Sequence, residues 1–483
     1  MTVQQILFLL GVAALVAGVG DEIARQTSRR TGFLAAGPFL LIAAAPLIPN
    51  RSVILGFSLD DALPLLGLAL MIPLVPWDRL RAFHWNLAPG PTIAFLGIAT
   101  MIAAGILSAI VVAGTPGDAV RLAVRGSGRL GFLLAVVVCV AVIGSTKRSR
   151  LFSARVIAAV GTVEASFGLI AYFIGLPGGA GLEMPRGSVL IGEVPGRVSG
   201  TIGLSPNFTA AILMMSVLVT AGLALRADDR RERIACWLLG IVQFTALTLT
   251  YTRVSLGLTI VGLVVLVLLR SRPLLLAPIV LVLVPVATLT PMLERIVSDV
   301  PDRLALWSSA FLLMIDHPVG GIGAGQMLDA VAADPERYRA TIFGEAWSTA
   351  HNTVLMAGAE TGVLGAIGAI ILNLGLLVVA ARAFVSAPPG RAGNLQVAAS
   401  LALVAFLVQG MVNNLFTVGV TGVCAAFLLG SQILEARLGS AEEPSRSADE
   451  PAVQRGWTEL LRSWRRQPPQ QAGVGIHERP GGV

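Results

Sequence analysis

The stretch STAHNTVLMAGAETGVLGAIGAIILNLGLL, residues 348–377, joins a short polar segment to a long apolar run. Because about 20 apolar residues cross the ~30 Å hydrocarbon core of a bilayer, the run predicts a transmembrane helix. His351 and Asn352 stand at the polar edge of this run, in a chain with only 4 His among 483 residues. The stretch therefore predicts a membrane span that carries a titratable, hydrogen-bonding pair at one end.

The composition extends this prediction to the whole chain. Hydrophobic residues make up 55% of the sequence and charged residues only 13%, which excludes an ordinary soluble globular protein. Apolar windows of membrane-spanning length recur from Leu7 to Ile433, with short polar breaks between them. We therefore predict an all-α polytopic membrane protein with about 12–14 transmembrane helices. The start MTVQQ lacks a basic segment, so we expect the first apolar run to be retained.

The distribution of charge predicts the topology. The formal net charge is +7, but the basic residues form short clusters between apolar runs and no continuous basic face with aromatic residues. No nucleic-acid partner is therefore expected. Arginine-rich breaks alternate with arginine-poor ones, and the positive-inside rule assigns the rich set to the cytoplasm. The longest outer break then covers about residues 291–350, where mixed charges predict short helices on the outer membrane surface.

Changes in composition along the chain predict four regions. We expect N-terminal transmembrane helices in residues 1–158, a core in residues 159–380 that includes the outer loop, C-terminal transmembrane helices in residues 381–436, and a partly disordered cytoplasmic tail in residues 437–483. Within the tail, the segment VQRGWTELLRSWRRQ is consistent with a short helix on an anionic membrane surface or with chance periodicity in a disordered chain.

Four ionisable residues in the outer breaks are candidates for function, because a charge that faces lipid is costly. They are Arg197, Arg253, Arg303 and His351. Each also has a structural interpretation. Arg253 could anchor a helix at the membrane surface, and Arg303 could pair with its neighbour Asp302. The Ser-Pro-Asn entry after Arg197 could be a helix cap, and so could the polar pair that contains His351.

The functional interpretation follows from the chemistry of these groups. Guanidinium groups bind phosphate bidentately and stay charged, so two of them suit a diphosphate. A neutral imidazole can accept a proton from a hydroxyl near pH 7. Together they suit transfer of a group from a phosphate-bearing donor to a hydroxyl acceptor. No ATP is supplied outside the bacterial inner membrane, so the donor would arrive in the bilayer as a polyprenyl diphosphate. The outer loops lack a carboxylate motif, so no metal or other cofactor is expected.

Three features of the loops remain outside this chemistry. The string HPVGGIGAGQ predicts turns, because so many glycines destabilise a helix, and it lacks the ending of a phosphate-binding loop. Glu360 lies about half a turn round the helix from His351, so we expect it to make a separate polar contact within the membrane. Arg121, Arg125 and Arg129 follow a spacing of four, which predicts one face of a helix lying on the surface.

Four motifs in order carry a resemblance to a known family. They are GRVSGTIGLSPNFTAAIL, LTYTRVSLGLTIV, DRLALWSSAFLLMIDHPVGGIGAGQ and AHNTVLMAGAETGVLGAIG. From about residue 159 to residue 380, their spacing resembles that of the bacterial O-antigen ligase and polymerase family. The resemblance implies a helical glycosyltransferase of the GT-C type that takes glycan from undecaprenyl diphosphate on the periplasmic side, without metal.

The resemblance also implies roles for individual residues. Arg253 and Arg303 match the family's diphosphate-binding arginines, and His351 matches its catalytic histidine. Arg197 matches a further motif arginine that we group with the donor site, and Asn352 and Asn207 are supporting candidates. The motif often reads Ser-Arg where this chain has Thr-Arg, so the hydroxyl is kept.

We therefore expect a multi-pass protein of the bacterial inner membrane with its active site on the periplasmic face. The expected activity is O-antigen ligation from an undecaprenyl diphosphate-linked donor to lipid A-core, in lipopolysaccharide biosynthesis. The alternative within the class is an O-antigen or exopolysaccharide polymerase, whose acceptor is another lipid-linked glycan. A lipid or glycan transporter is the alternative from another class, although the sequence shows no convincing internal repeat.

Overall fold

The computed structural model describes part of the chain. The described residues are 53–54, 57–58, 88–143, 147–175, 182–183, 196–200, 205–269, 290–338, 341–342, 345–346, 349–388, 390–415, 421–422, 424–426 and 428–432. The chain divides into two compact units, Met1–Arg437 and Leu438–Val483, and every described residue belongs to the first. The predicted amphipathic segment of the tail lies outside the described residues.

Helices dominate the described residues, which confirms the prediction of an all-α polytopic membrane protein. The long helices are α5 (Pro89–Val112), α7 (Arg129–Ile143), α8 (Lys147–Ile174), α9 (Pro206–Arg226), α10 (Arg230–Leu249), α11 (Arg253–Leu269), α13 (Thr290–Asp316), α16 (Thr353–Val385) and α17 (Arg391–Gly410). Short helices are α6 (Pro116–Ala123), α14 (Met327–Ala333) and α15 (Pro335–Tyr338), and a π-helical turn, Val124–Gly128, joins α6 to α7.

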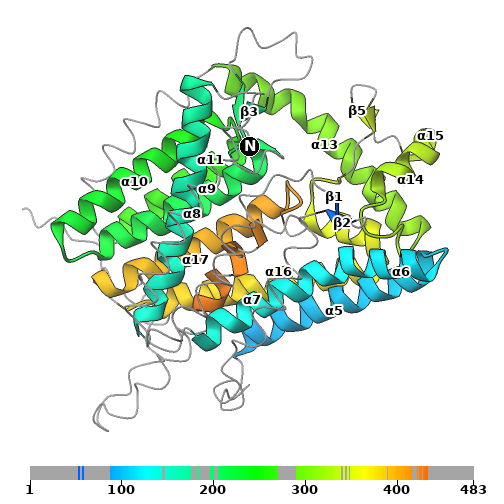
Figure 1. The fold of residues 1–483 in the computed structure, drawn as a ribbon, viewed down its shortest axis with the longest axis horizontal. Coiled ribbons are helices and arrows are strands. Elements are labelled where there is room, and N and C mark those ends of the chain that lie inside the picture. The colour runs from blue at the N-terminus through cyan, green and yellow to red at the C-terminus, as the bar shows by residue number, and fades with distance from the viewer. Residues whose placement is uncertain are drawn as a thin grey trace, which may run out of the picture. The chain divides into compact units, whose positions relative to one another are not determined.

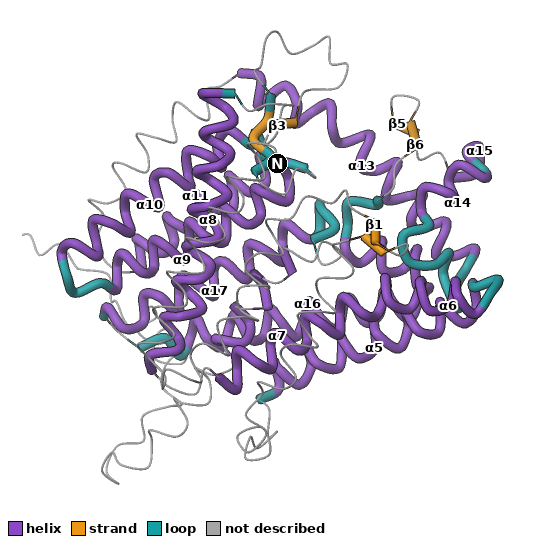
Figure 2. The backbone as a smooth tube through the Cα atoms, viewed as in Figure 1, coloured by secondary structure: helices purple, strands orange, loops and turns teal. Residues whose placement is uncertain are grey.

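The described strands are pairs of two residues each, and they lie in the connections between helices (Figure 2). Each pair is antiparallel: β1 (Val53–Ile54) with β2 (Phe57–Ser58), β3 (Leu182–Glu183) with β4 (Arg197–Val198), and β5 (Thr341–Ile342) with β6 (Glu345–Ala346). Only the second pair contains a candidate residue: its register places Arg197 opposite Glu183.

Six helices of the described part are long and apolar enough to cross a membrane. They are Pro89–Val112, Ser153–Ile174, Pro206–Arg226, Arg230–Leu249, Thr353–Val385 and Gly393–Gly410. The predicted total of about 12–14 also counts apolar runs in residues 1–87 and 270–289, which lie outside the described residues, so this number stays a prediction. Two predicted region boundaries, after residues 158 and 380, fall inside α8 and α16.

Helix α17 connects two groups of helices (Figure 1). In one group, α8, α10 and α11 pack around α9, which is almost entirely buried and therefore apolar all round. In the other group, α16 packs along α5 and also contacts α13. Helix α17 packs on α9, α11 and α16. Each of these three helices begins at or next to a candidate residue.

The glycine-rich connector forms turns over residues 317–325, as the sequence predicts, and it packs on a kink in α16. The backbone leaves helical geometry at Thr361 and Gly362, where φ of Gly362 is 74°. The freed groups bond to the connector: Val363 N–H donates to Pro318 O at 2.9 Å, and Gly323 N–H donates to Glu360 O at 3.0 Å. A Cβ at Gly362 would overlap Pro318 O, so only glycine fits there.

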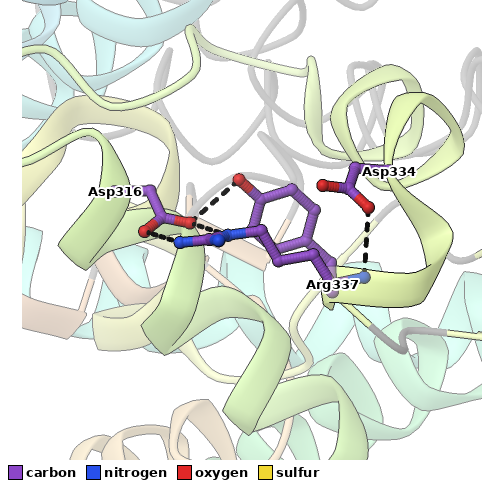
Figure 3. A network of polar contacts seen from close by, with 4 residues as sticks. Asp316, Asp334 and Arg337 are labelled. Atoms are coloured by element: carbon purple, nitrogen blue, oxygen red, sulfur yellow. Dashed lines mark hydrogen bonds and ion pairs between the residues drawn. The ribbon is translucent and has the colours of Figure 1, made fainter.

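The segment from α13 to the first turns of α16 has its own small core, which includes Leu306, Met327, Ala350 and Met356. At its edge, Arg337 binds the Asp316 carboxylate through two N–H groups at 2.7 and 2.6 Å (Figure 3). The Tyr338 hydroxyl donates to the same carboxylate at 3.0 Å, and these hydrogen bonds, Arg337 first, lower the pKa of Asp316. This network fastens α15 to the end of α13.

Candidate functional site

The start of α16 positions His351. This residue has φ of 49°, in the left-handed region that non-glycine residues rarely adopt, and Asn352 then caps the helix. The Asn352 side chain accepts from the N–H groups of Val354 and Leu355, both at 3.0 Å. Ala350 before it is fully buried in the small core that also contains Leu306 and Met327. The imidazole is therefore held between a packed residue and a capped helix.

The segment after α17 binds the same helix start. Asn352 Nδ2 donates to Met411 O at 2.9 Å, and Thr353 Oγ1 donates to Asn413 O at 3.3 Å. Arg303, from α13, donates through Nη1 to Val412 O. Three consecutive carbonyls of one chain segment therefore hold two different helices, α13 and α16, beside each other.

Arg303 and His351 interact electrostatically at this segment. Burial and, to a smaller extent, the positive charge of Arg303 lower the pKa of His351, a hydrogen bond with the Asn413 side chain raises it, and the net pKa is about 4. The imidazole is consequently neutral at pH 7, which is the form that accepts a proton. The structure thus brings together a guanidinium and a neutral imidazole that lie 48 positions apart in the sequence.

The start of α11 has the same local geometry around Arg253. Tyr251 has φ of 52°, Thr252 follows, and Arg253 opens the helix. Arg197 holds this entry: its Nε donates to Thr250 O at 2.9 Å, and its Nη2 donates to Thr252 Oγ1 at 3.3 Å. Burial and a hydroxyl contact of 3.4 Å with Tyr172 raise the pKa of Tyr251 to about 12, so this phenol stays neutral.

Asn207 completes the network at the α11 entry. Its Oδ1 accepts from Arg197 Nη2 and from Thr252 Oγ1, both at 3.2 Å. Ser205 is the N-cap of α9 and Pro206 is its first residue, which confirms the capping interpretation of this entry. The start of α9 therefore has two roles. Ser205 caps the helix, and Asn207 accepts a hydrogen bond from Arg197.

A buried hydrogen bond links the two helix starts. Ser255, in the first turn of α11, donates to Gln409 Oε1 at 2.6 Å, and Gln409 belongs to the last turn of α17. The carbonyls that hold Arg303 and Asn352 follow within four residues. The end of α17 therefore contacts the entries of both α11 and α16. The sequence signal for this segment is weak: Gln409, Asn413 and Asn414 stand between two apolar runs.

The predicted residues thus fall into two connected clusters. One contains Arg303, His351 and Asn352, and the other contains Arg197 and Asn207 beside the start of α11. Arg253 opens α11 and is partly buried. The predicted pairing of Arg303 with Asp302 involves a side chain outside the described residues. Within the described part of the chain, no group of three His, Cys, Asp or Glu side chains could hold a metal ion.

A comparison with protein families matches residues 234–370 to the model described as O-antigen ligase. A comparison with curated proteins found no match. The matched segment is shorter than the predicted core and includes Arg253, Arg303, His351 and Asn352 but neither Arg197 nor Asn207. The resemblance predicted from the motifs is confirmed over this segment: residues 234–370 of this membrane protein match the O-antigen ligase family.

Proposed function

We propose that this protein is a membrane glycosyltransferase of the GT-C type that transfers a glycan from undecaprenyl diphosphate to a sugar hydroxyl on the periplasmic face of the bacterial inner membrane. The proposal depends on the convergence of Arg303 and His351 on one chain segment, because this convergence pairs a phosphate-binding cation with a proton acceptor. The match to the O-antigen ligase family supports the same activity. Ligation to lipid A-core is the form of the reaction that we expect.

The reaction would proceed as a single displacement. The acceptor hydroxyl oxygen forms a bond to the anomeric carbon of the donor glycan, while the bond from that carbon to the diphosphate oxygen breaks. His351 accepts the hydroxyl proton, and undecaprenyl diphosphate departs with the bonding electron pair. Arg253 and Arg303 stabilise the negative charge that develops on the departing diphosphate, so the reaction would need no metal ion.

The low pKa of His351 fits a base that the donor activates. In the free protein a pKa of about 4 leaves the imidazole neutral but weakly basic. A diphosphate beside Arg303 would offset the positive charge that lowers this pKa, so donor binding would raise the basicity of His351. Proton transfer would then become favourable only when both substrates are present. Asn352 would support this step, because it caps the helix directly after the imidazole.

Arg197 and Asn207 have a different part in this proposal. Nε and Nη2 of Arg197 donate to groups around the start of α11, and Asn207 accepts within the same network. Both residues would therefore orient the turn that presents Arg253. A direct contact of Arg197 with the donor diphosphate stays a prediction, and no nucleic acid is expected among the partners.

The test is transfer by the purified full-length protein in lipid nanodiscs. The assay would supply an undecaprenyl diphosphate-linked O-antigen and lipopolysaccharide that lacks O-antigen. We expect release of undecaprenyl diphosphate and a ladder of longer lipopolysaccharide on a gel. Longer lipid-linked chains without a ladder would instead identify a polymerase. Movement of intact donor across the membrane, with no release of undecaprenyl diphosphate, would contradict both forms and favour a transporter.

A further inference from the structure

A polar cavity lies beside the start of α16, on a side that His351 does not line. Its volume is about 280 Å³, near the lower end of the ~300–1,000 Å³ typical of small-molecule sites. Charged and polar side chains share its wall with an equal number of apolar residues and glycines. The polar residues that line it are Arg125, Arg129, Thr349, Thr353, Glu360, Thr361 and Asn414.

The two arginines reach the cavity from one helical run. The π-helical turn Val124–Gly128 widens the run between α6 and α7, and Ser127 Oγ fastens it to α5 by donating to Ile102 O at 2.9 Å. Arg125 and Arg129 line the cavity, whereas Arg121 lies outside its lining and pairs with Asp118 at 3.4 Å. The cavity thus takes two of the three arginines, and the surface-lying position predicted for their helix stays a prediction.

Glu360 supplies the one acidic side chain of the cavity lining. Its carboxylate accepts from the Gly325 N–H at 2.7 Å, which fixes it to the glycine-rich connector. It also interacts electrostatically with Arg129 and Arg125. Two guanidinium groups and one carboxylate leave the lining with a net positive charge. Such a set binds an anion through the arginines and sugar hydroxyls through the carboxylate, the threonines and Asn414.

The cavity shares its wall with the His351 cluster. Thr349 and Thr353 flank His351 on either side in the sequence, and both line the cavity. Asn414 follows Asn413, whose side chain contacts the imidazole. A ligand in the cavity would therefore lie against the same helix entry that holds the proton acceptor. A transferase with two large substrates needs such a second subsite beside its base.

We propose that this cavity binds a phosphorylated sugar unit of one lipid-linked substrate, with Arg125 and Arg129 on its phosphate and Glu360 on its hydroxyls. This inference rests on the proposed glycan transfer and adds a subsite to it. The cavity volume of about 280 Å³ suits one sugar unit. The unit could belong to the acceptor core or to the donor, and the two sources predict different kinetics.

The first experiment measures binding without catalysis. Glucose 6-phosphate and glucose would be titrated into the full-length protein in nanodiscs, with binding followed by calorimetry. We expect glucose 6-phosphate to bind wild type more tightly than glucose does, and Arg125→Gln and the double variant with Arg129→Gln to weaken that binding by about tenfold or more. Arg121→Gln is the matched control on the same helix and should bind as wild type does.

Equal binding of glucose 6-phosphate to wild type and to both cavity variants would overturn the proposal, and so would no binding to wild type. These outcomes do not depend on transfer activity, so they separate a failure of the cavity from a failure of the proposed function. The single variant Arg125→Gln alters an exposed side chain and guards against misfolding of the double variant.

The second experiment identifies the source of the phosphate through transfer kinetics. If the acceptor binds here, the double variant should raise KM for the lipopolysaccharide acceptor and leave KM for the lipid-linked donor unchanged. If the donor binds here, the double variant should raise KM for the lipid-linked donor and leave KM for the lipopolysaccharide acceptor unchanged. Unchanged KM values for both substrates, in a double variant that elutes like wild type in size exclusion, would overturn the subsite.

Discussion

The starts of α11 and α16 share one local design but differ in what surrounds it. Each begins with a non-glycine residue in the left-handed region, Tyr251 or His351. A polar residue follows, and its carbonyl accepts the first helical N–H, from Leu256 at 3.1 Å or from Met356 at 2.9 Å. The strained residue is thus fixed by its surroundings at both places.

An arginine from another element lies at each helix start. At α11, Arg197 donates to the backbone and to two side chains, and the strained Tyr251 has a pKa of about 12. At α16, burial and the charge of Arg303 together bring the pKa of His351 to about 4. The same kind of helix start therefore binds a neighbouring arginine at α11 and presents a titratable imidazole at α16.

The largest expected effect on transfer activity is that of His351, one of the two residues in the left-handed region. His351→Ala should reduce transfer by about 100-fold or more, because it removes the proton acceptor. The purified variant should keep the elution volume and melting temperature of wild type within a few degrees. His317→Ala is the control, since this second histidine is exposed at the end of α13. Wild-type turnover in His351→Ala would remove the difference between the two helix starts.

The next effect tests the arginines assigned to the diphosphate. Arg303→Lys and Arg253→Lys keep the charge but lose bidentate geometry, so each should lower kcat/KM by about tenfold or more. The matched control is Arg391→Lys, because Arg391 forms an exposed pair with Asp228 at 2.7 Å. If both active-site variants turn over like the control, the arginines act only as structural anchors.

A smaller effect tests the network at the α11 entry. Thr252→Val keeps the shape of the side chain but removes the hydroxyl between Arg197 and Asn207, so kcat should fall by about tenfold. Thr252→Ser keeps the hydroxyl and should restore most of the rate. The pair distinguishes a hydrogen-bonding role from simple packing, because packing alone would make the serine variant the worse of the two.

The smallest effect concerns pH. A base must be deprotonated to act, and a pKa of about 4 keeps His351 deprotonated well below neutral pH. The value of kcat/KM, which reports the free enzyme, should therefore change by less than about twofold between about pH 7.5 and about pH 6 and fall only nearer pH 4. The acid limb of kcat should lie at a higher pH, because bound diphosphate raises the pKa of the imidazole. A loss of kcat/KM near pH 6.5 would contradict the lowered pKa of His351, and with it the effects of burial and of Arg303.

Much of the site was predictable because its residues are unusual for their surroundings. Charged and titratable groups beside apolar runs are rare, so Arg253, Arg303 and His351 stood out without a structure. Cavity residues were harder to find. Arg125 and Arg129 were visible as a basic helix, but the π-helical turn that directs them into the cavity depends on packing against α5.

The sequence by itself determined the helical membrane class, the turns of the glycine-rich connector and the identity of the chemical groups. These follow from apolar length, glycine content and side-chain type, which are local properties. Only the tertiary structure decided which groups meet. The segment from Gln409 to Asn413 joins three helices through side chains and carbonyls, and carbonyl groups carry no sequence signal. The kink at Gly362 likewise acquires its role only when the connector supplies the missing hydrogen-bond partners.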